Sequence, residues 1–519
     1  MPIATAPSLK EEHPVTVSES THGEATDKTH DVSSKKGEKI IQIVLLLSTL
    51  CLAYNKFSLF EESPEPFGYR TILRSCSSIA ALFVSLIIIT SQTDNGDNST
   101  ATTHVSYPFE TVYAFYLPFM LTLLFNKRVT VLNSVLALNT IHQSPLLRFL
   151  TQFSVVCFTD YNPLFAATII AINMAFNKSL KVVSELKSLD IVDCNLFSTL
   201  LVNILCLPWV PNNNNESSVP ILIVRGTLLA LLSTVLFNTT IDTLMKRLYP
   251  AMFKSYWRSL ILFTNVLLMF PFLINTFIEL QGIETPIIWL VTFITQTRTR
   301  ELIFSTWLLC LLIVVPTMIK HKAKLSLNTS RKLWHFMIFT MIVVPFRYDS
   351  IIVKIALAGI IPLFLCVEYL RYLKLQPWGS SLDNALRQFA DYRDRKGPLI
   401  VSYIYLILGV SVPLLLFDSP AGLVSLGIGD AFASIVGKKL GRWRWPGGEK
   451  TVEGTAAFVL CSVVVTYLLK QFLGYYSTLS MGGLFVSCLM SGVLEGNSVL
   501  NDNILVPSFM LICERLLSS

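Results

Sequence analysis

The sequence predicts an all-α, polytopic integral membrane protein, and two observations support this class. Hydrophobic residues make up 52% of the 519 residues and charged residues 14%, and the mean hydropathy is +0.57. Apolar runs recur from residue 40 nearly to the C-terminus, and many approach the ~20 residues that cross a bilayer as a helix. Counting these runs gives a bundle of roughly 13 to 16 transmembrane helices.

The chain begins with a polar segment, residues 1–39, that is rich in Ser, Thr, Lys and Glu. It does not have the features of a cleavable signal peptide, and we expect a disordered tail on the cytosolic side. The ten cysteines occur singly, without metal-type spacing, so we expect small buried hydrophobes. The net charge of +7 is spread over short loops, which argues against nucleic acid as a partner.

Residues 40–319 contain the first series of apolar runs. These runs lie at 40–54, 72–91, 111–125, 129–141, 150–176, 197–210, 219–237, 257–277, 287–295 and 302–319. No cluster of titratable residues in this part indicates chemistry. We therefore expect a multi-span scaffold that surrounds or accommodates lipid.

The character of the sequence changes at Lys320, where a catalytic membrane domain, residues 320–519, is expected to begin. Four polar clusters follow, at 320–332, 374–396, 438–453 and 495–503. The first three each contain five Lys or Arg residues, a density typical of cytosolic loops. Two apolar runs separate each cluster from the next, at 333–346 and 351–373, 399–417 and 421–437, and 452–469 and 481–494. Because two crossings return a chain to its starting side, all four clusters are expected at one membrane face.

Residues 421–455 combine an acid inside an apolar run with a basic, glycine-rich loop. Asp430 is costly in such a run unless it is paired, hydrated or bound to an ion, so it marks a functional site. On a helix, a stripe of small and polar residues would be formed by Gly427, Asp430, Ser434, Gly437 and Gly441. The cations and free N–H groups of the loop suit a polyphosphate, although a basic loop after a span is also a topology signal. The loop does not have Walker A spacing.

Two other segments at this face carry candidate ligands. Glu495, Asp502 and Asn503 offer hard oxygens that suit Mg²⁺ or a related cation held with substrate phosphates, or else they form a polar turn with helix caps. Arg331 and His335 lie four residues apart and Lys332 is adjacent, which presents a cationic edge to phosphate or to anionic lipid headgroups.

Two sets of charges have a structural interpretation. Glu368 and Arg371 lie at i and i+3 in apolar sequence, as expected of an intramembrane ion pair. Asp391 and Asp394 precede a span, where a solvated loop is the simpler interpretation.

Acids for a cation, amines for phosphates and a lipid-embedded setting together favour transfer of a phosphoryl or nucleotidyl group to or from a lipid. An alternative from another class is an ion-coupled transporter that uses Asp430 and Glu368, which predicts inverted repeats. A non-catalytic scaffold would leave the clustered Gly, Asp and Lys residues unexplained.

Residues 330–507 resemble the polyprenol kinase family, which includes dolichol kinases, phytol kinases and CTP-dependent diacylglycerol kinases. The motifs that carry the resemblance are SRKLWH at 330–335, EYLR at 368–371, GDAFAS at 429–434 with Gly437, KTVEGT at 450–455, Glu495, and DNILVP at 502–507. The chain length, the long N-terminal part and the Trp-Pro-Gly before KTVEGT are similar to the fungal dolichol kinases of the endoplasmic reticulum.

The resemblance implies transfer of the γ-phosphate of CTP to the terminal hydroxyl of dolichol, at the cytosolic face of the endoplasmic reticulum membrane. The product, dolichyl phosphate, would supply N-glycosylation, O-mannosylation and GPI anchor synthesis. A CTP-binding region at 429–455 is implied, with catalytic roles for Asp430, Lys450 and Glu453. The implied nucleotide contacts are Arg331, His335, Gly429, Ser434, Gly437, Lys438, Lys439, Trp445, Pro446, Gly447, Thr451, Gly454 and Thr455. The implied ligands of a divalent cation, Mg²⁺ or Ca²⁺, are Asp430, Glu495 and Asp502. A kinase of another lipid alcohol, diacylglycerol or phytol, is the alternative.

Overall fold

The computed structural model describes residues 24–59, 108–125, 129–140, 144–157, 162–206, 219–249, 255–278, 285–317, 327–387, 390, 394–395, 397–446, 448–498 and 500–518. Every regular element in these ranges is a helix. Seven of the described helices are long and apolar enough to cross a membrane, and shorter apolar helices of 10–17 residues accompany them. The all-α polytopic membrane class is therefore confirmed, while the number of spans stays a prediction.

The helices in the first part of the chain in several cases begin earlier than the apolar runs suggest, above all the first one. Their bounds are α1 (Glu24–Leu59), η1 (Pro108–Glu110), α3 (Thr111–Phe125), α4 (Thr130–Leu136), η3 (Ala137–Thr140), α5 (Pro145–Cys157), α6 (Pro163–Ser184), α7 (Ile191–Cys206), α8 (Val219–Leu248), α9 (Ser255–Phe277), α10 (Pro286–Thr295), α11 (Arg298–Leu309) and η5 (Cys310–Val314). Residues 24–39, expected to belong to a disordered tail, are helical in α1, because a helix nucleated in the apolar half gains one hydrogen bond for each residue added. Residues 1–23 and the expected span at 72–91 lie outside the described residues.

The run at 150–176, expected as one span, is divided between α5 and α6. Asn162 caps α6, since its side chain accepts from the Leu164 N–H at 2.9 Å. Pro163 takes the first helical position, where its missing N–H costs nothing. The Asn162 cap and Pro163 together fix the start of a new helix here, which separates α6 from α5.

The second part of the chain contains the helices that frame the polar clusters. Their bounds are α13 (Leu327–Tyr348), α14 (Ser350–Tyr372), α15 (Gly379–Arg387), α17 (Ser402–Phe417), η7 (Leu423–Asp430), α18 (Ala431–Leu440), α19 (Val452–Leu473), α20 (Met481–Asn497) and α21 (Asp502–Leu517). Helix α13 has 22 residues, so the apolar run at 333–346, which looked short for a span, belongs to a helix of adequate length. The element η7 is a π-helix that continues directly into α18.

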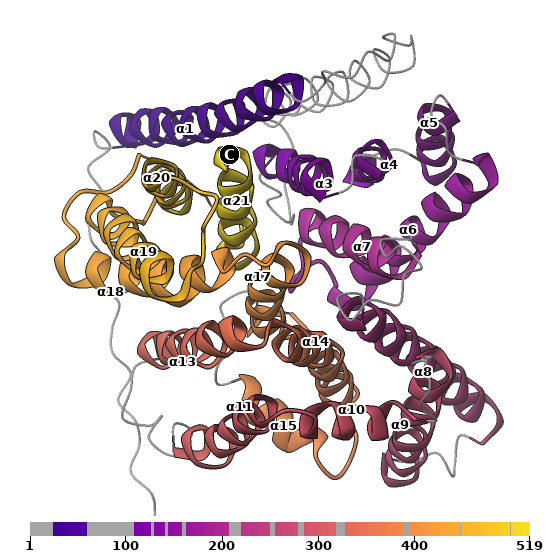
Figure 1. The fold of residues 1–519 in the computed structure, drawn as a ribbon. Helices are drawn as coiled ribbons and strands as arrows, with labels where there is room; N and C mark the ends of the chain where they lie inside the picture. The colour runs from indigo at the N-terminus through magenta and orange to yellow at the C-terminus, as the bar shows by residue number, and fades with distance from the viewer. Residues whose placement is uncertain are drawn as a thin grey trace, which may run out of the picture.

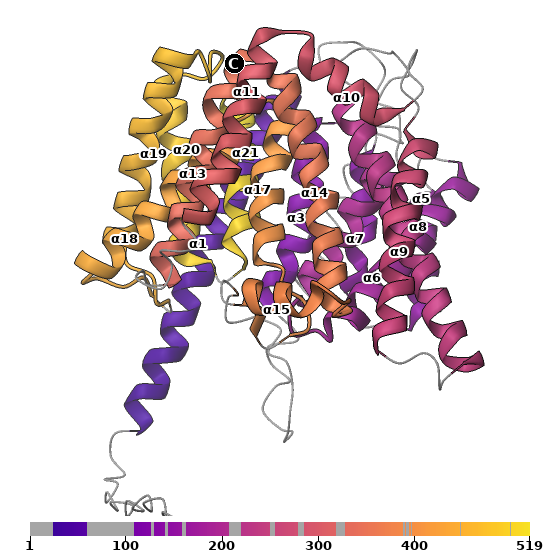
Figure 2. The ribbon, with the colours of Figure 1, turned by 90° about the horizontal axis from the view of Figure 1, so that it is seen from below.

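Helices α18 to α21 pack as one group, with α13, α14 and α17 beside them and α3 to α9 beyond, while α1 lies along α20, α21 and α3 (Figure 1). In the view of Figure 2, α15, α18 and the N-terminal part of α1 lie at one end of the bundle, and the C-terminus lies at the other. The polar clusters next to α15 and α18 therefore share one end, as predicted.

Two clusters of buried apolar residues hold the bundle together. The larger one joins α13, α14, α17, η7 and α21, with Leu414 and Val424 near its centre. The second joins α1 and α3 to α20 and α21, and Tyr113, Leu494 and Phe509 are completely buried in it. The N-terminal helices and the C-terminal helices thus share one packed interior.

Candidate functional site

A cavity of about 350 Å³ opens at the end of the bundle where the polar clusters meet. The charged side chains that line it are Arg331, Lys332, Lys438, Lys450, Asp430, Glu449, Glu495 and Asp502. Four of them are basic and four acidic, so their formal charges cancel. The other lining residues are small or polar, namely Ala433, Ser434, Gly437, Thr451, Gly454 and Asn503. Three of the four predicted clusters contribute charged residues to this one cavity.

Asp430 lies deep in the cavity, at the end of η7, and is 8% exposed. The Lys332 amine of α13 forms an ion pair with its carboxylate. His335 Nδ1 lies 3.3 Å from the same carboxylate oxygen and 3.1 Å from the Leu426 carbonyl oxygen. Two basic side chains of α13 therefore hold the acid that the sequence singled out.

Lys450 bridges the other two acids of the cavity. Its Nζ lies 2.7 Å from Glu495 Oε1 and 3.7 Å from Asp502 Oδ2, and it donates to the Glu495 carbonyl oxygen at 2.8 Å. Burial lowers the pKa of the Lys450 amine, but the Glu495 and Asp502 carboxylates outweigh this effect and raise that pKa above its ordinary value. The amine is therefore charged at neutral pH.

The carboxylates of Asp430, Glu495 and Asp502 converge as the sequence predicted. One oxygen from each lies within 4.8 Å of the others. Ligands on opposite sides of Ca²⁺ are about 4.6–5.2 Å apart, and those of Mg²⁺ about 4.0–4.2 Å. Three carboxylate oxygens this close together can converge on one divalent cation, either Mg²⁺ or Ca²⁺.

The basic loop after α18 folds back as a hairpin. Arg444 and Thr451 form an isolated antiparallel bridge, and the Trp445 N–H donates to the Lys450 carbonyl oxygen at 3.0 Å. Glu453, expected to be catalytic, instead accepts from the backbone N–H groups of Arg442 at 2.9 Å and Trp443 at 3.1 Å. Its carboxylate secures the base of the hairpin and does not line the cavity.

Glycines allow α18 and α19 to approach closely beside the cavity. A Cβ on Gly437 would lie 2.9 Å from Thr451 Oγ1, and one on Gly454 would lie 2.9 Å from the Ala433 carbonyl oxygen. Thr451 also caps α19, because its hydroxyl oxygen accepts from the Gly454 N–H at 3.2 Å. Since α21 also begins at the cavity, with Asp502, two helix N-termini border it, and both favour anions.

Several residues expected to contact the nucleotide have packing roles. Trp445 Nε1 donates to Thr455 Oγ1 at 2.9 Å, and a Cβ on Gly496 would lie 2.5 Å from that nitrogen, so Trp445 packs the hairpin against α20. A Cβ on Gly37 of α1 would lie 3.2 Å from Pro446. None of these residues lines the cavity.

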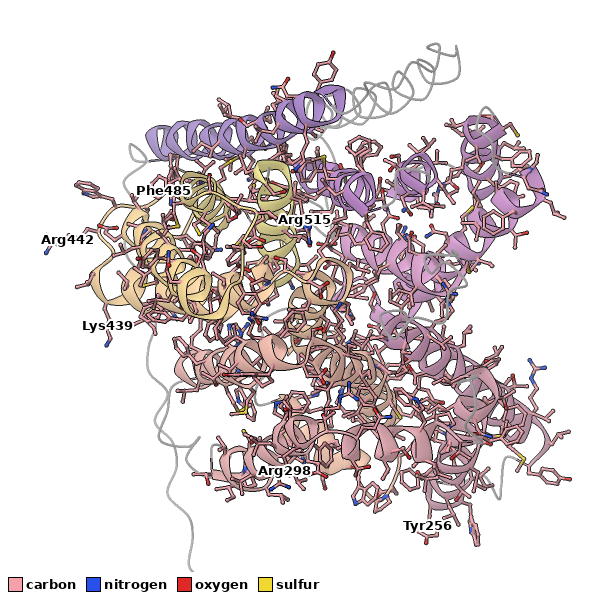
Figure 3. The ribbon with its side chains drawn as sticks, viewed as in Figure 1. Tyr256, Arg298, Lys439, Arg442, Phe485 and Arg515 are labelled. Carbon is pink, nitrogen blue, oxygen red and sulfur yellow. The ribbon has the colours of Figure 1, made fainter. Side chains whose placement is uncertain are left out.

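The predicted stripe of small residues is only partly realised. Gly427, a member of the stripe, and Gly429, an implied nucleotide contact, pack against Phe339 and Phe458, where a Cβ would lie 2.8 Å and 2.5 Å from the aromatic side chains. The reason is that the π-helical turn of η7 abandons the spacing of an α-helix. Lys439 and Arg442 point away from the bundle (Figure 3) and are exposed. Gly447 lies outside the described residues.

The Glu368–Arg371 ion pair is confirmed, and it belongs to a larger buried network. Arg371 Nε donates to Glu368 Oε2 at 2.8 Å, its Nη1 donates to Asp383 Oδ1 at 2.5 Å, and Tyr403 OH donates to Glu368 at 2.7 Å. Asp394, interpreted as part of a solvated loop, is buried instead and accepts from the Val401 N–H at 3.1 Å at the start of α17. These residues do not line the cavity and have structural roles.

Glu449 lines the cavity but was not among the predicted site residues. Lys332, expected with Arg331 and His335 at a cationic edge, and Asn503, expected as an oxygen donor, also line it. Arg331 and Lys332 line the cavity, whereas His335 does not line it and contacts the Asp430 carboxylate.

Comparison with known proteins supports one family. Residues 30–208 match the model of the dolichol kinase N-terminal domain. The chain is 40% identical over 490 residues to the dolichol kinase of Saccharomyces cerevisiae, an alignment that covers 92% of this chain and 89% of that one. It is 31% identical over 255 residues to the dolichol kinase of Bos taurus, which covers 44% of this chain and 47% of that one. No solved structure matches the chain. Because the alignment with the yeast dolichol kinase covers most of both chains, this chain belongs to the dolichol kinase family.

Proposed function

We propose that this chain transfers the γ-phosphate of CTP to the terminal hydroxyl of dolichol, at the cytosolic face of the endoplasmic reticulum membrane. The observation that carries the proposal is the convergence of Lys332, Asp430, Lys450, Glu495 and Asp502 on one cavity at the end of a membrane bundle. Family membership supports dolichol as the acceptor and argues against the ion-coupled transporter. CTP as donor rests on the resemblance of the 429–455 region to the polyprenol kinases.

In this mechanism the triphosphate enters from water and the alcohol from the membrane. Lys450, Lys438 and Arg331 bind the phosphates, and the N-termini of α19 and α21 add backbone N–H groups. Asp430 orients the hydroxyl and receives its proton as the new O–P bond forms. The bond between the γ-phosphorus and the β–γ bridging oxygen breaks, and CDP leaves. Positioning and charge stabilisation are the main requirements of such a reaction.

A divalent cation, Mg²⁺ or Ca²⁺, would be held by Asp430, Glu495 and Asp502. When bound there, it would neutralise part of the triphosphate charge and bring the β- and γ-phosphates into line with the acceptor. Lys332 and Lys450 pair with these same carboxylates. We expect the two amines to turn towards phosphate oxygens when nucleotide and cation bind.

The proposal is tested with the full chain purified into proteoliposomes. Radiolabelled CTP or ATP is supplied with dolichol, diacylglycerol or phytol, and labelled lipid is measured. We expect dolichyl phosphate from CTP and little from ATP. Equal use of ATP would overturn the assignment of the donor, and preference for another alcohol would overturn that of the acceptor. Sealed microsomes that convert added CTP without detergent would support the cytosolic orientation, because CTP does not cross the membrane, whereas activity only after permeabilisation would contradict it.

A further inference from the structure

A second cavity, of about 160 Å³, lies inside the bundle between α3, α4, α7, α8, α17 and α21. Its wall is largely apolar and includes Leu121, Phe125, Leu200, Leu416 and Ile504. Helices α3, α4 and α7 fall within residues 30–208, the part of the chain that matches the N-terminal domain of dolichol kinases. This cavity therefore lies where the N-terminal domain meets helices of the catalytic half.

The polar side chains in the wall are largely occupied by partners inside the protein. Asn133 and Asn203 donate to each other, with Nδ2 to Oδ1 distances of 3.0 Å and 2.7 Å. The Thr122 hydroxyl donates to the Pro118 carbonyl oxygen at 2.6 Å. Since these groups do not need a ligand to satisfy them, the cavity suits an apolar occupant rather than water.

The apolar cavity is separated from the catalytic cavity by the first turn of α21. Asn503 lines the catalytic cavity, and the next residue, Ile504, lines the apolar one. On the other side of this turn, Gly409 of α17 also lines the apolar cavity, and a Cβ there would lie only 2.0 Å from the Asn503 carbonyl oxygen. The two cavities therefore adjoin at this turn, and the space beside the three carboxylates lies next to the space among the apolar side chains.

We propose that this apolar cavity receives an isoprene unit near the hydroxyl end of the polyprenol, while the hydroxyl itself reaches Asp430. This inference rests on the proposed function, since it names where that substrate lies. The size agrees with the occupant, because a cavity of about 150 Å³ lined by Leu, Ile and Phe holds one benzene ring, which has about as many carbons as one five-carbon unit.

The cavity would act by positioning rather than by hydrophobic affinity. The alcohol arrives from a bilayer whose tails are as apolar as leucine, so entry removes little apolar surface from water. What a shaped cavity provides is a fixed place for one branched unit, and therefore a fixed distance from the hydroxyl to the phosphate. An ordinary acyl chain, which is unbranched, would not need such a site.

The first test fills the cavity and varies the length of the acceptor. Leu200→Trp in α7 is compared with the matched control Leu268→Trp, in α9, whose side chain is 66% exposed on the outer surface. Both variants receive CTP and alcohols of one to four isoprene units. For wild type we expect kcat/KM to rise about tenfold at the unit that enters the cavity. Leu200→Trp should lose that rise and keep the activity with the shorter alcohol, whereas Leu268→Trp should behave as wild type.

Identical chain-length profiles for the two variants would overturn the inference while leaving the proposed function intact. Failure of wild type to phosphorylate dolichol in the same assay would instead overturn the proposed function. A second measurement needs neither turnover nor a stable variant. Wild-type protein in liposomes is irradiated with a polyprenol that carries a diazirine on its second isoprene unit. Labelling of α3, α7 or the start of α21 that dolichol competes away supports the proposal, and labelling confined to α9–α11 overturns it.

Discussion

Asp430→Asn is the most informative single change, because it removes one charge of the catalytic cavity and keeps the size of the side chain. The side chains of Asp430 and Lys332 are each 11% exposed. The variant therefore leaves the Lys332 ammonium group largely buried without its partner. Removing one partner of a buried pair costs about 3–5 kcal/mol. The cavity has a mouth to water, so we expect the lower end of this range, about 3 kcal/mol in the free energy of unfolding.

The effect of Asp430→Asn on the reaction is expected to be larger than its effect on stability. An amide cannot receive the hydroxyl proton, and loss of a positioned general base lowers turnover by about 10²–10⁴-fold. The double variant Lys332→Met, Asp430→Asn removes both charges, so it should recover most of the lost stability and none of the activity. Stability is measured as Tm in detergent, and turnover with labelled CTP and dolichol.

A matched control exists in the same part of the chain. The Asp418 carboxylate pairs with Lys354 Nζ at 2.6 Å, and the two side chains are 63% and 13% exposed. Because water screens this carboxylate, we expect the pair to contribute about 0–1 kcal/mol. Asp418→Asn should therefore change neither Tm nor turnover appreciably. The reasoning is refuted if Asp430→Asn keeps more than about a tenth of wild-type turnover, or if the double variant is no more stable than the single one.

Four other expectations follow from the same geometry. Chelation with EDTA should abolish transfer and added Mg²⁺ or Ca²⁺ should restore it; activity that survives chelation contradicts the carboxylate site. Glu453→Gln should raise KM for CTP about threefold to tenfold, because it loosens the hairpin, with kcat nearly unchanged, whereas a hundredfold fall in kcat would restore a direct catalytic role. The pKa of Lys450 is raised, so stabilisation by its ion pairs is complete below the ordinary pKa of 10.5 and is lost only as pH rises through the higher folded-state pKa; kcat/KM should show no alkaline limb from this amine below about pH 10. Arg371→Met should destabilise the protein by about 3–5 kcal/mol, yet the folded fraction should keep normal KM values in steady-state assays.

The convergence of the acids could be predicted because it depends on counting. Polar clusters separated by pairs of apolar runs must return to one end of a bundle, and this places Asp430, Glu495 and Asp502 together without any knowledge of side-chain direction. The oxygens that meet within 4.8 Å come from segments up to 72 residues apart in the chain. Counting runs does not predict which side chains of the hairpin face the cavity.

The positions of Glu453 and Trp445 outside the cavity share one physical cause. Glu453 and Trp445 lie in the segment that resembles a nucleotide site, but the direction of each side chain is decided by the register of the hairpin, which the sequence does not display. The Arg444–Thr451 bridge turns the Glu453 carboxylate to backbone N–H groups, and Trp445 turns to Thr455. Similarly, the π-helical η7 changes which glycines face the cavity, and a pattern based on α-helical spacing cannot detect it.

The N-terminal helices have a direct part in this geometry. Gln42 of α1 donates to the Asn497 carbonyl oxygen at 2.6 Å, two residues after Glu495, and accepts from Tyr113 OH of α3 at 2.6 Å. Helices α1 and α3 therefore fix the end of α20 that carries one of the three acids. A fragment cut at residue 320 would expose Leu494 and Phe509, which are completely buried against α1 and α3. We therefore expect the first part of the chain to help hold α20 and α21 where their carboxylates meet Asp430.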